Sequence, residues 1–306
     1  MDLIVGLTDA GRFISHYTTI ETAIEHILPK RRLRIGTFSR TNDPKENKTW
    51  EFQPGATRRA TNLVKYNLHA TQELSRGLTA QLKGRARVVC FCSDQGPLTA
   101  TPLDDIYQRG FAKARMWAQY GGAHTGVCLV FDRLELERRI EQQFTAPKFA
   151  AIGAPIQYVN RRIIRDFGPN DPYAIQVELL EAMGMRKYAQ AHLERFHHRL
   201  FFEKVTDWRD EVEYRWVVWS NTTDDLHLDY GAALRGVIFG ENVRSDLADE
   251  VMGLTFNDRA QWQRLKWDNG SPWYDFGNFK YDRQIRTMGG WGQPPLPDKN
   301  RPPPWQ

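Results

Sequence analysis

Cysteine is scarce in this chain of 306 residues, which contains only Cys90, Cys92 and Cys128. A small and odd number of cysteines argues against a disulfide framework and is typical of a reducing compartment. Long apolar runs are also missing, because no segment approaches the roughly 20 apolar residues that a membrane helix requires. The first residues carry no basic leader followed by an apolar stretch, as a secretory signal would. We therefore expect a cytoplasmic protein without a membrane segment.

The chain also lacks the short motifs of several common enzyme classes. It has no G-x-G-x-x-G after a strand, no Walker A loop, no H-E-x-x-H and no G-x-S-x-G. No matching pairs of cysteine or histidine stand at zinc-finger spacing. Cys90 and Cys92 lie in the apolar run "RVVCFCS", which predicts a buried strand with both thiols on one face. We therefore expect no metal site and assign these two cysteines to core packing.

Charge and aromatic content carry more information. The formal net charge is +5 and the sequence pI is about 9.1, a balance that suits a polyanionic or nucleotide partner. The basic residues are dispersed, so a solvated surface accounts for most of them. Aromatic residues make up 12% of the chain, with ten Trp, and we expect ring-lined grooves as well as an aromatic core.

The first 40 residues predict a strand, a helix and a second strand. The stretch "FISHYTTIETAIEHILPK" places His16 and Tyr17 where the first strand passes into the helix. Thr18 and Glu21 have the spacing of a capping box, with Thr18 as the N-cap. The apolar residues that follow recur at helical spacing, and "RLRIGTF" then alternates as a strand does. Two hydrogen-bonding rings at this junction either close the strand or hold a ligand at its tip.

Further along, the pattern predicts buried strands at "RVVCFCS" and "VCLVF", a charged helix over 133–143, and a long helical stretch over 174–202 that breaks near Gly184. With no internal repeat and no shift in composition, we expect one α+β domain over 1–288. Residues 289–306 form a tail rich in proline and glycine, without an apolar period.

The run "EVEYRWVVW" predicts a strand with charges on one face. Val212, Tyr214, Trp216 and Val218 alternate with Glu211, Glu213, Arg215 and Val217. Charges on a central strand are costly to bury unless they are paired. The strand is therefore either an edge strand with a solvated face or the floor of a cleft that presents a carboxylate. The neighbouring tryptophans favour burial, and so the cleft.

The order "HYT…IL…LR…NDPKE…CFCS…MWAQY…HTGVCLVFD…K…W…EVEYRWV" resembles a bacterial family known as domain of unknown function 2971, over roughly residues 14–240. That family is similar to the ADP-ribosyltransferases, on the strength of a histidine at the end of the first strand, a helix after it and a glutamate on a late strand. The resemblance implies a mixed, split central sheet with flanking helices, and NAD bound in its cleft as a substrate.

The resemblance also implies roles for individual residues. His16 would bind the adenosine ribose and the backbone of Tyr17 the nicotinamide amide, with Thr18 and Ser93 at neighbouring strand ends. Glu213 would bind the nicotinamide ribose and stabilise the oxocarbenium-like charge, although Glu211 remains an alternative. Tyr120 or Tyr17 would stack on nicotinamide, and Arg40, Asn42 and Arg215 would meet the pyrophosphate. One departure is Tyr17, which stands where such transferases usually have glycine.

Three functions follow from these observations. The first is an NAD-dependent ADP-ribosyltransferase that modifies a macromolecule, RNA, DNA or protein; the resemblance implies a toxin or a phage-defence effector with an antitoxin or immunity partner. The second is a metal-dependent nuclease in which Asp43, Glu46, Glu211, Glu213 and Lys204 hold Mg²⁺. The third is a non-catalytic module that binds a nucleotide or nucleic acid. If Glu213 is an exposed cleft residue, Glu213→Gln should abolish activity and shift the melting temperature by only a few degrees.

Overall fold

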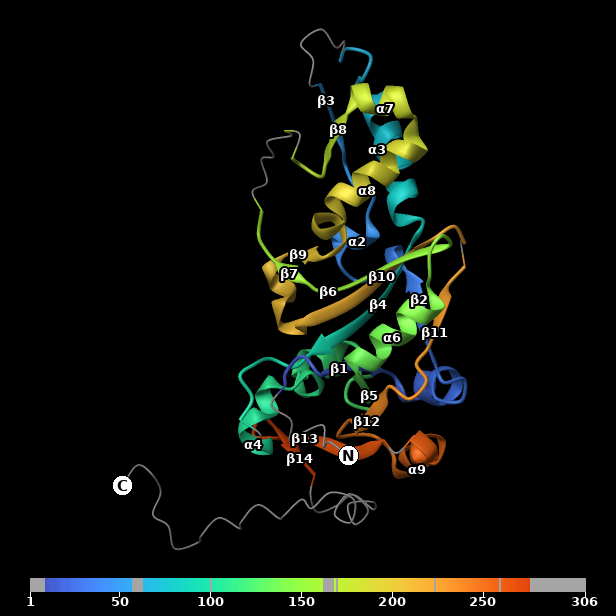
Figure 1. Cartoon of the computed structure of the whole chain (residues 1–306). Coiled ribbons are helices and arrows are strands. Elements are labelled where there is room, and N and C mark those ends of the chain that lie inside the picture. The colour runs from blue at the N-terminus through green and yellow to red at the C-terminus, as the bar shows by residue number, and fades with distance from the viewer. Residues whose placement is uncertain are drawn as a thin grey trace, which may run out of the picture.

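A mixed sheet of ten strands forms the centre of the computed structural model (Figure 1). The structure describes residues 9–275, apart from 57–62, 100, 162–167, 169, 223 and 259. The strands of the central sheet are β1 (Phe13–Thr18), β2 (Arg32–Thr37), β4 (Ala86–Ser93), β5 (Val127–Asp132), β6 (Phe149–Pro155), β10 (Glu213–Ser220), β11 (Leu226–Asp229), β12 (Leu234–Phe239), β13 (Gln261–Asp268) and β14 (Ser271–Tyr274). Two small sheets pair β3 (Gln53–Gly55) with β8 (Ala174–Gln176), and β7 (Gln157–Tyr158) with β9 (Glu203–Lys204).

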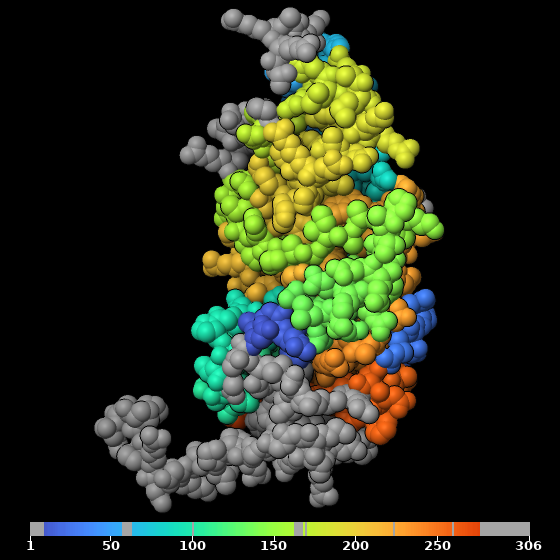
Figure 2. All heavy atoms as spheres, in the orientation of Figure 1, coloured from blue at the N-terminus to red at the C-terminus, as the bar shows by residue number. Residues whose placement is uncertain are grey.

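The helices are α1 (Ile20–Thr22), which a π-helical turn continues over Ala23–Ile27, α2 (Pro44–Asn47), α3 (Leu68–Lys83), α4 (Pro102–Asp105), α5 (Ala114–Gln119), α6 (Arg133–Gln143), α7 (Val177–Met183), α8 (Met185–Phe201) and α9 (Ser245–Thr255). Helices α3, α7 and α8 gather at one end of the molecule, and α9 lies near the other (Figures 1 and 2). The protein is therefore α+β, as the sequence predicted. None of the helices in the described part of the chain has the length and apolarity to span a membrane.

Strand β4 has three partner strands. β10 pairs with one edge of it along nearly the whole strand. The other edge is shared, because β2 pairs at residues 87–88 and β1 at residues 92–93. Within the described chain, residues 89–91 have no strand partner on this second edge. β1 and β2 therefore separate along β4 and leave an opening in the sheet.

Three hydrophobic clusters flank the sheet. One packs Val89 and Phe91 of β4 against the face that α6 and α9 cover. On the other face, Val88 belongs to a second cluster with α3 and α8, whereas Cys92 belongs to a third cluster with Trp117. The stretch of this face that lies between the second and third clusters is where β1 and β2 separate.

The predicted start of the first helix is one residue early. Thr18 is the last residue of β1, and Thr19 is the N-cap, because its side chain accepts a hydrogen bond from the backbone N–H of Thr22 at 3.3 Å. The predicted break near Gly184 is confirmed: α7 ends at Met183, and Gly184 has a φ of 75° that suits glycine.

The strand predicted from "EVEYRWVVW" begins later than expected. Glu211 ends a 3₁₀ turn over Thr206–Glu211, and β10 begins at Glu213. Val212 between them has the left-handed angles φ 45° and ψ 49°, a strained conformation for a β-branched residue. The assignment of Glu211 and Val212 to the strand was therefore wrong, whereas the alternation from Tyr214 onward holds. The proline- and glycine-rich tail at 289–306 lies outside the described residues.

Candidate active site

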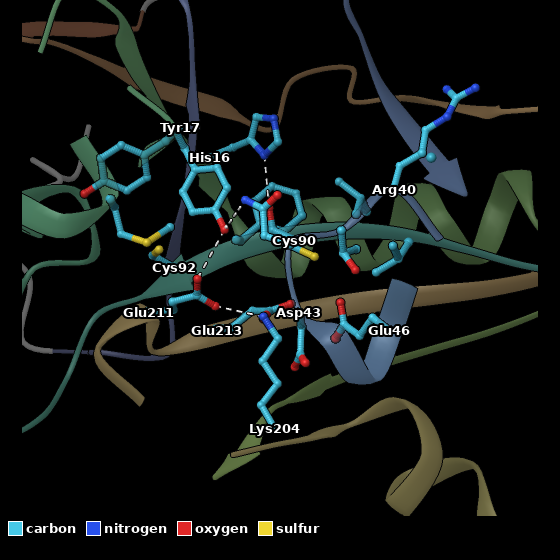
Figure 3. Close-up of a pocket in the computed structure, with 18 of the residues that line it drawn as sticks. His16, Tyr17, Arg40, Asp43, Glu46, Cys90, Cys92, Lys204, Glu211 and Glu213 are labelled. Carbon is cyan, nitrogen blue, oxygen red and sulfur yellow. Dashed lines mark hydrogen bonds and ion pairs between the residues drawn. The ribbon is translucent and has the colours of Figure 1, made fainter. Parts of the chain in front are cut away.

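A cavity of about 460 Å³ lies where β1 and β2 separate along β4. Figure 3 shows 18 of the residues that line it. The lining residues are Ser15, His16, Tyr17, Arg34, Gly36, Thr37, Arg40, Thr41, Asn42, Asp43, Glu46, Val88, Val89, Cys90, Phe91, Cys92, Met116, Tyr120, Lys204, Glu211 and Glu213. Both His16, from an early strand, and Glu213, from a late strand, thus line one cavity, as the sequence predicted.

His16 bridges the opening in the sheet. Its Nδ1 lies 3.0 Å from the carbonyl oxygen of Cys90, in the part of β4 that has no partner on this edge. A carbonyl oxygen only accepts, so Nδ1 carries the proton and Nε2 is left as a hydrogen-bond acceptor. Burial lowers the pKa of His16 below 6.5, more than its bond to Cys90 raises it. The imidazole is therefore neutral at pH 7.

Glu213 is a buried, ionised carboxylate. It is 5% exposed, and its two oxygens lie 2.5 Å from Arg215 Nε and 2.7 Å from Lys204 Nζ. Burial acts to raise the pKa of Glu213, but the charges of Arg215 and Lys204 outweigh it and lower the pKa to about 2. The expectation of an exposed cleft residue was wrong, which removes the reason for expecting only a small change in melting temperature when it is substituted.

Glu211 shares Lys204 with Glu213 but has the opposite pKa shift. Its Oε2 accepts a hydrogen bond from Lys204 at 2.8 Å, and its Oε1 accepts one from the hydroxyl of Tyr120 at 3.3 Å. Burial raises the pKa of Glu211, more than Lys204 lowers it. Two carboxylates in one cavity therefore titrate apart, an arrangement typical of acid and base pairs at active sites.

Tyr120 and Tyr17 line the cavity in different ways. The hydroxyl of Tyr120 accepts a hydrogen bond from Asn42 Nδ2 at 3.3 Å and donates one to Glu211, so it connects residues 40–46 to the acid pair. Burial raises the pKa of Tyr120 to about 12, so the hydroxyl stays protonated. The hydroxyl of Tyr17 instead donates to the carbonyl of Gly110 at 2.8 Å and packs in the third cluster. Tyr17 therefore lines the cavity with its hydroxyl already engaged by the protein.

Two arginines line the cavity from the β2 side. Arg34 and Arg40 are 61% and 64% exposed, and their guanidinium groups lie 3.8 and 3.3 Å from Asp225 Oδ2. Exposed ion pairs of this kind contribute little to stability, so both side chains can turn toward an anionic ligand at little energetic cost.

Asp43 and Glu46 come from the polar loop "NDPKEN". Asp43 is the N-cap of α2, and its Oδ1 accepts a hydrogen bond from the backbone N–H of Lys45 at 2.8 Å. Pro44 is the first residue of α2, where its missing N–H costs nothing. Glu46 Oε1 accepts a hydrogen bond from Arg215 at 2.6 Å. Both acids are almost fully buried, at 4% and 2% exposure.

Not every residue predicted for the site reaches the cavity. His16, Tyr17, Arg40, Asn42, Tyr120 and Glu213 line it, whereas Thr18, Ser93 and Arg215 are not among the lining residues. Thr18 pairs with Val127 in the sheet, and the backbone N–H of Ser93 donates to the carbonyl of Val212. Arg215, at 1% exposure, is enclosed by Glu213 and Glu46, so it positions these acids instead of facing a ligand.

The structure also gathers the residues of the nuclease interpretation. Asp43, Glu46, Glu211, Glu213 and Lys204 all line the cavity. In the described residues, however, no group of three or more His, Cys, Asp or Glu side chains is arranged to hold a metal ion. The acids are instead arranged around Lys204 and Arg215.

Sequence reasoning missed Arg34, Thr37 and Thr41 in the lining. A signal for Arg34 was present, because "RLRIGTF" alternates and places Arg34 on the face opposite the buried Leu33 and Ile35. That this face borders a ligand-sized cavity depends on the separation of β1 from β2, which is a long-range feature.

Comparison with known proteins gives one result. Residues 116–216 match the model of a family described as protein of unknown function (DUF2971). The match runs from α5 into β10 and includes Tyr120, Lys204, Glu211 and Glu213. No curated protein and no solved structure matches the chain. About a third of the chain is thus similar to this family, and that third carries two of the four acids in the lining, Glu211 and Glu213.

Proposed function

We propose that this protein is an NAD-dependent ADP-ribosyltransferase-like enzyme that modifies a macromolecule. The observation that carries the proposal is that His16 on β1 and Glu213 on β10 line one cavity, at the point where β1 and β2 separate along β4. An opening of this kind in a central sheet is the arrangement that the resemblance to ADP-ribosyltransferases implies, with NAD in the cleft.

The ionised carboxylate of Glu213 suits cleavage of the bond between nicotinamide and ribose. As that bond breaks, its electron pair passes to nicotinamide, which leaves neutral, and positive charge develops on the ribose carbon. Glu213 is ionised above a pH of about 2 and held in place by Arg215 and Lys204, so it supplies a fixed negative charge for the transition state. A preorganised charge of this kind needs no reorganisation during the reaction.

Glu211 has the properties of the proton acceptor in the second half of the reaction. The nucleophilic atom of the acceptor bonds to the ribose carbon and loses its proton. A general base works best when its pKa lies near the working pH, and burial raises the pKa of Glu211 above its usual value. The sequence left open whether Glu211 or Glu213 is the key carboxylate, and in this mechanism each has a role.

The remaining lining residues suit the rest of NAD. His16 Nε2 is an acceptor for a ribose hydroxyl. Arg34 and Arg40 are exposed and weakly paired, and a guanidinium binds two phosphate oxygens at once. Tyr120 also lines the cavity, and we propose that its ring contacts nicotinamide. As the resemblance implies, we propose that the acceptor is RNA, DNA or protein and that the enzyme serves as a toxin or defence effector with an immunity partner.

The test uses purified protein, NAD labelled in its ADP-ribose half, and RNA, DNA or cell extract as acceptor. We expect nicotinamide release and transfer of the label, and a loss of about 100-fold or more in Glu211→Gln. The matched control is Glu203→Gln, since Glu203 is also buried and ion-paired, with Arg161, but does not line the cavity.

Two outcomes would replace the proposal. Folded wild-type protein that releases no nicotinamide and transfers no label would show that it is not an NAD-consuming enzyme; tight NAD binding without turnover would then favour a binding module. Cleavage of nucleic acid that stops in EDTA would favour the nuclease instead.

A further inference from the structure

Three carboxylate oxygens of residues that line the cavity have no hydrogen-bond partner among the described residues. One of them, Glu213 Oε2, has an ion pair with Lys204 at 2.7 Å, and the other two belong to Asp43 and Glu46. Asp43 uses only Oδ1, for the backbone N–H of Lys45, and Glu46 uses only Oε1, for Arg215. Asp43 Oδ2 and Glu46 Oε2 are buried and without a hydrogen-bond partner among the described residues, and both side chains line the cavity. An unpaired buried acceptor is costly, so these oxygens indicate a partner that the described residues do not supply.

The position of these two acids is firmly determined. Lys83 Nζ donates hydrogen bonds to the backbone carbonyls of Lys45, Glu46 and Lys48 and lies 4.2 Å from the ring centroid of Trp50. Lys45 Nζ in turn donates to the carbonyls of Arg199 and Glu203, at 2.8 Å each. α2 is therefore attached to both α3 and the end of α8. The backbone that carries Asp43 and Glu46 is fixed by these contacts, so mobility of this segment does not explain their unpaired oxygens.

The local charge argues against a cation as the missing partner. Four acids meet here, Asp43, Glu46, Glu211 and Glu213, and four bases surround them, Lys45, Lys83, Lys204 and Arg215. Burial lowers the pKa of Lys45 and of Lys83 to about 8, so both remain largely protonated at pH 7. Both lysines donate their hydrogen bonds to backbone carbonyls. Their charges therefore offset those of the acids, but they donate no hydrogen bond to the free carboxylate oxygens. The missing partner is therefore a neutral donor.

The same segment of chain offers donors beside these acceptors. Arg40 and Asn42 carry N–H groups, and all four residues line the cavity within residues 40–46. A hydroxyl both donates and accepts, whereas an amino group next to a carboxylate only donates. Two neighbouring carboxylates flanked by N–H donors thus match a pair of adjacent hydroxyls, and hydrogen bonds from O–H to a carboxylate are strong.

We propose that Asp43 and Glu46 form a subsite for the vicinal hydroxyls of a ribose. This inference rests on the proposed function, because NAD supplies the ribose. It adds to the site two residues that bind the ribose and take no part in the reaction. It assigns the acids of the "NDPKE" stretch to recognition of a ribonucleotide over its deoxy counterpart.

The experiment measures binding by calorimetry. The probes are NAD, its two halves AMP and nicotinamide mononucleotide, and the 2′-deoxy form of each half. The variants are Asp43→Asn and Glu46→Gln, because each amide can keep the oxygen that is already bonded and replace only the free one. We expect wild type to prefer the ribo form of one half by about tenfold or more, and each variant to lose most of that preference, because the amide nitrogen that replaces the free oxygen accepts no hydrogen bond from the hydroxyl.

The matched control is Asp132→Asn, because Asp132 is also a buried N-cap, of α6, and does not line the cavity. It should keep the wild-type preference, and melting curves of all three variants confirm folding. Variants that discriminate as wild type does, or that weaken the binding of the ribo and 2′-deoxy forms equally, would overturn the subsite. Nicotinamide release is assayed on the same samples. If the protein turns over NAD but the two variants discriminate as wild type does, only the proposed subsite is wrong. If ribose discrimination depends on Asp43 and Glu46 but no nicotinamide is released, only the proposed enzymatic function is wrong.

Discussion

Replacing Glu213 by glutamine should make the protein less stable by an amount that depends on pH. The carboxylate is 5% exposed and lies between Lys204 and Arg215, at 2.7 and 2.5 Å. Removing its charge leaves two buried cations with less compensation, a change that typically costs about 3–5 kcal/mol. The melting temperature should fall by roughly 10 °C, since about 1 kcal/mol corresponds to about 2–4 °C in a protein of this size class.

The pKa of Glu213 gives a second value for this loss of stability and also shows how the loss depends on pH. Folding lowers this pKa from 4.5 to about 2, and each pKa unit corresponds to about 1.4 kcal/mol, so the ionised carboxylate contributes about 3 kcal/mol. Because the folded pKa is the lower one, this contribution is complete above pH 5. It decreases as the pH falls from 4.5 towards 2.

The assay is urea unfolding of wild type and Glu213→Gln at pH 7, 5, 4 and 3. We expect a difference in the free energy of unfolding of about 3 kcal/mol at pH 7 and 5 that shrinks steadily below pH 4.5. As a control, Glu73→Gln removes an exposed pair with Arg76 and should change stability by less than about 0.5 kcal/mol. A difference between wild type and Glu213→Gln that stays constant down to pH 3 would refute the reasoning, because the loss would then not come from an ionised carboxylate.

Two further predictions concern other parts of the cavity and sheet. Tyr120→Phe removes the hydroxyl that donates to Glu211 at 3.3 Å and keeps the ring. We expect a loss of stability below about 1.5 kcal/mol and a several-fold slower nicotinamide release, measured on the same samples, whereas an unchanged rate would exclude the hydroxyl of Tyr120 from the reaction. Gly153→Ala places a Cβ 2.2 Å from the indole nitrogen of Trp216, so the free energy of unfolding in urea should fall by about 1–3 kcal/mol, and an unchanged value would mean that β6 can move away from Trp216.

The elements that the sequence predicted well are those that local patterns determine. The continuous apolar runs became β4 and β5, and the strand alternation from Tyr214 onward is confirmed by the two faces of β10 in separate clusters. The break at Gly184 followed from the backbone freedom of glycine. Each of these depends on neighbours within a few residues, which is the range over which periodicity and propensity act.

The errors come from interactions that no local pattern records. Thr18 and Thr19 are equally good N-caps, and the choice fell to Thr19 because Thr18 pairs with Val127 of β5. Val212 is β-branched and would be expected in a strand, but it takes a left-handed conformation, and its carbonyl accepts a hydrogen bond from Ser93 of β4. The burial of Glu213 likewise follows from a long-range contact, the pairing of β10 with β4, which places Glu213 beside Cys92.

The left-handed residue also explains why the two glutamates differ. In a continuous strand Glu211 and Glu213 would share one face and one environment. The turn at Val212 instead lets both reach Lys204, which cannot neutralise two carboxylates at once. Arg215, two residues after Glu213 on the same face of β10, adds a second positive charge to Glu213 alone. The alternation of one strand therefore decides which of the two pKa values is lowered and which is raised. The roles that we propose, Glu213 as the fixed charge and Glu211 as the base, depend on this placement of Arg215.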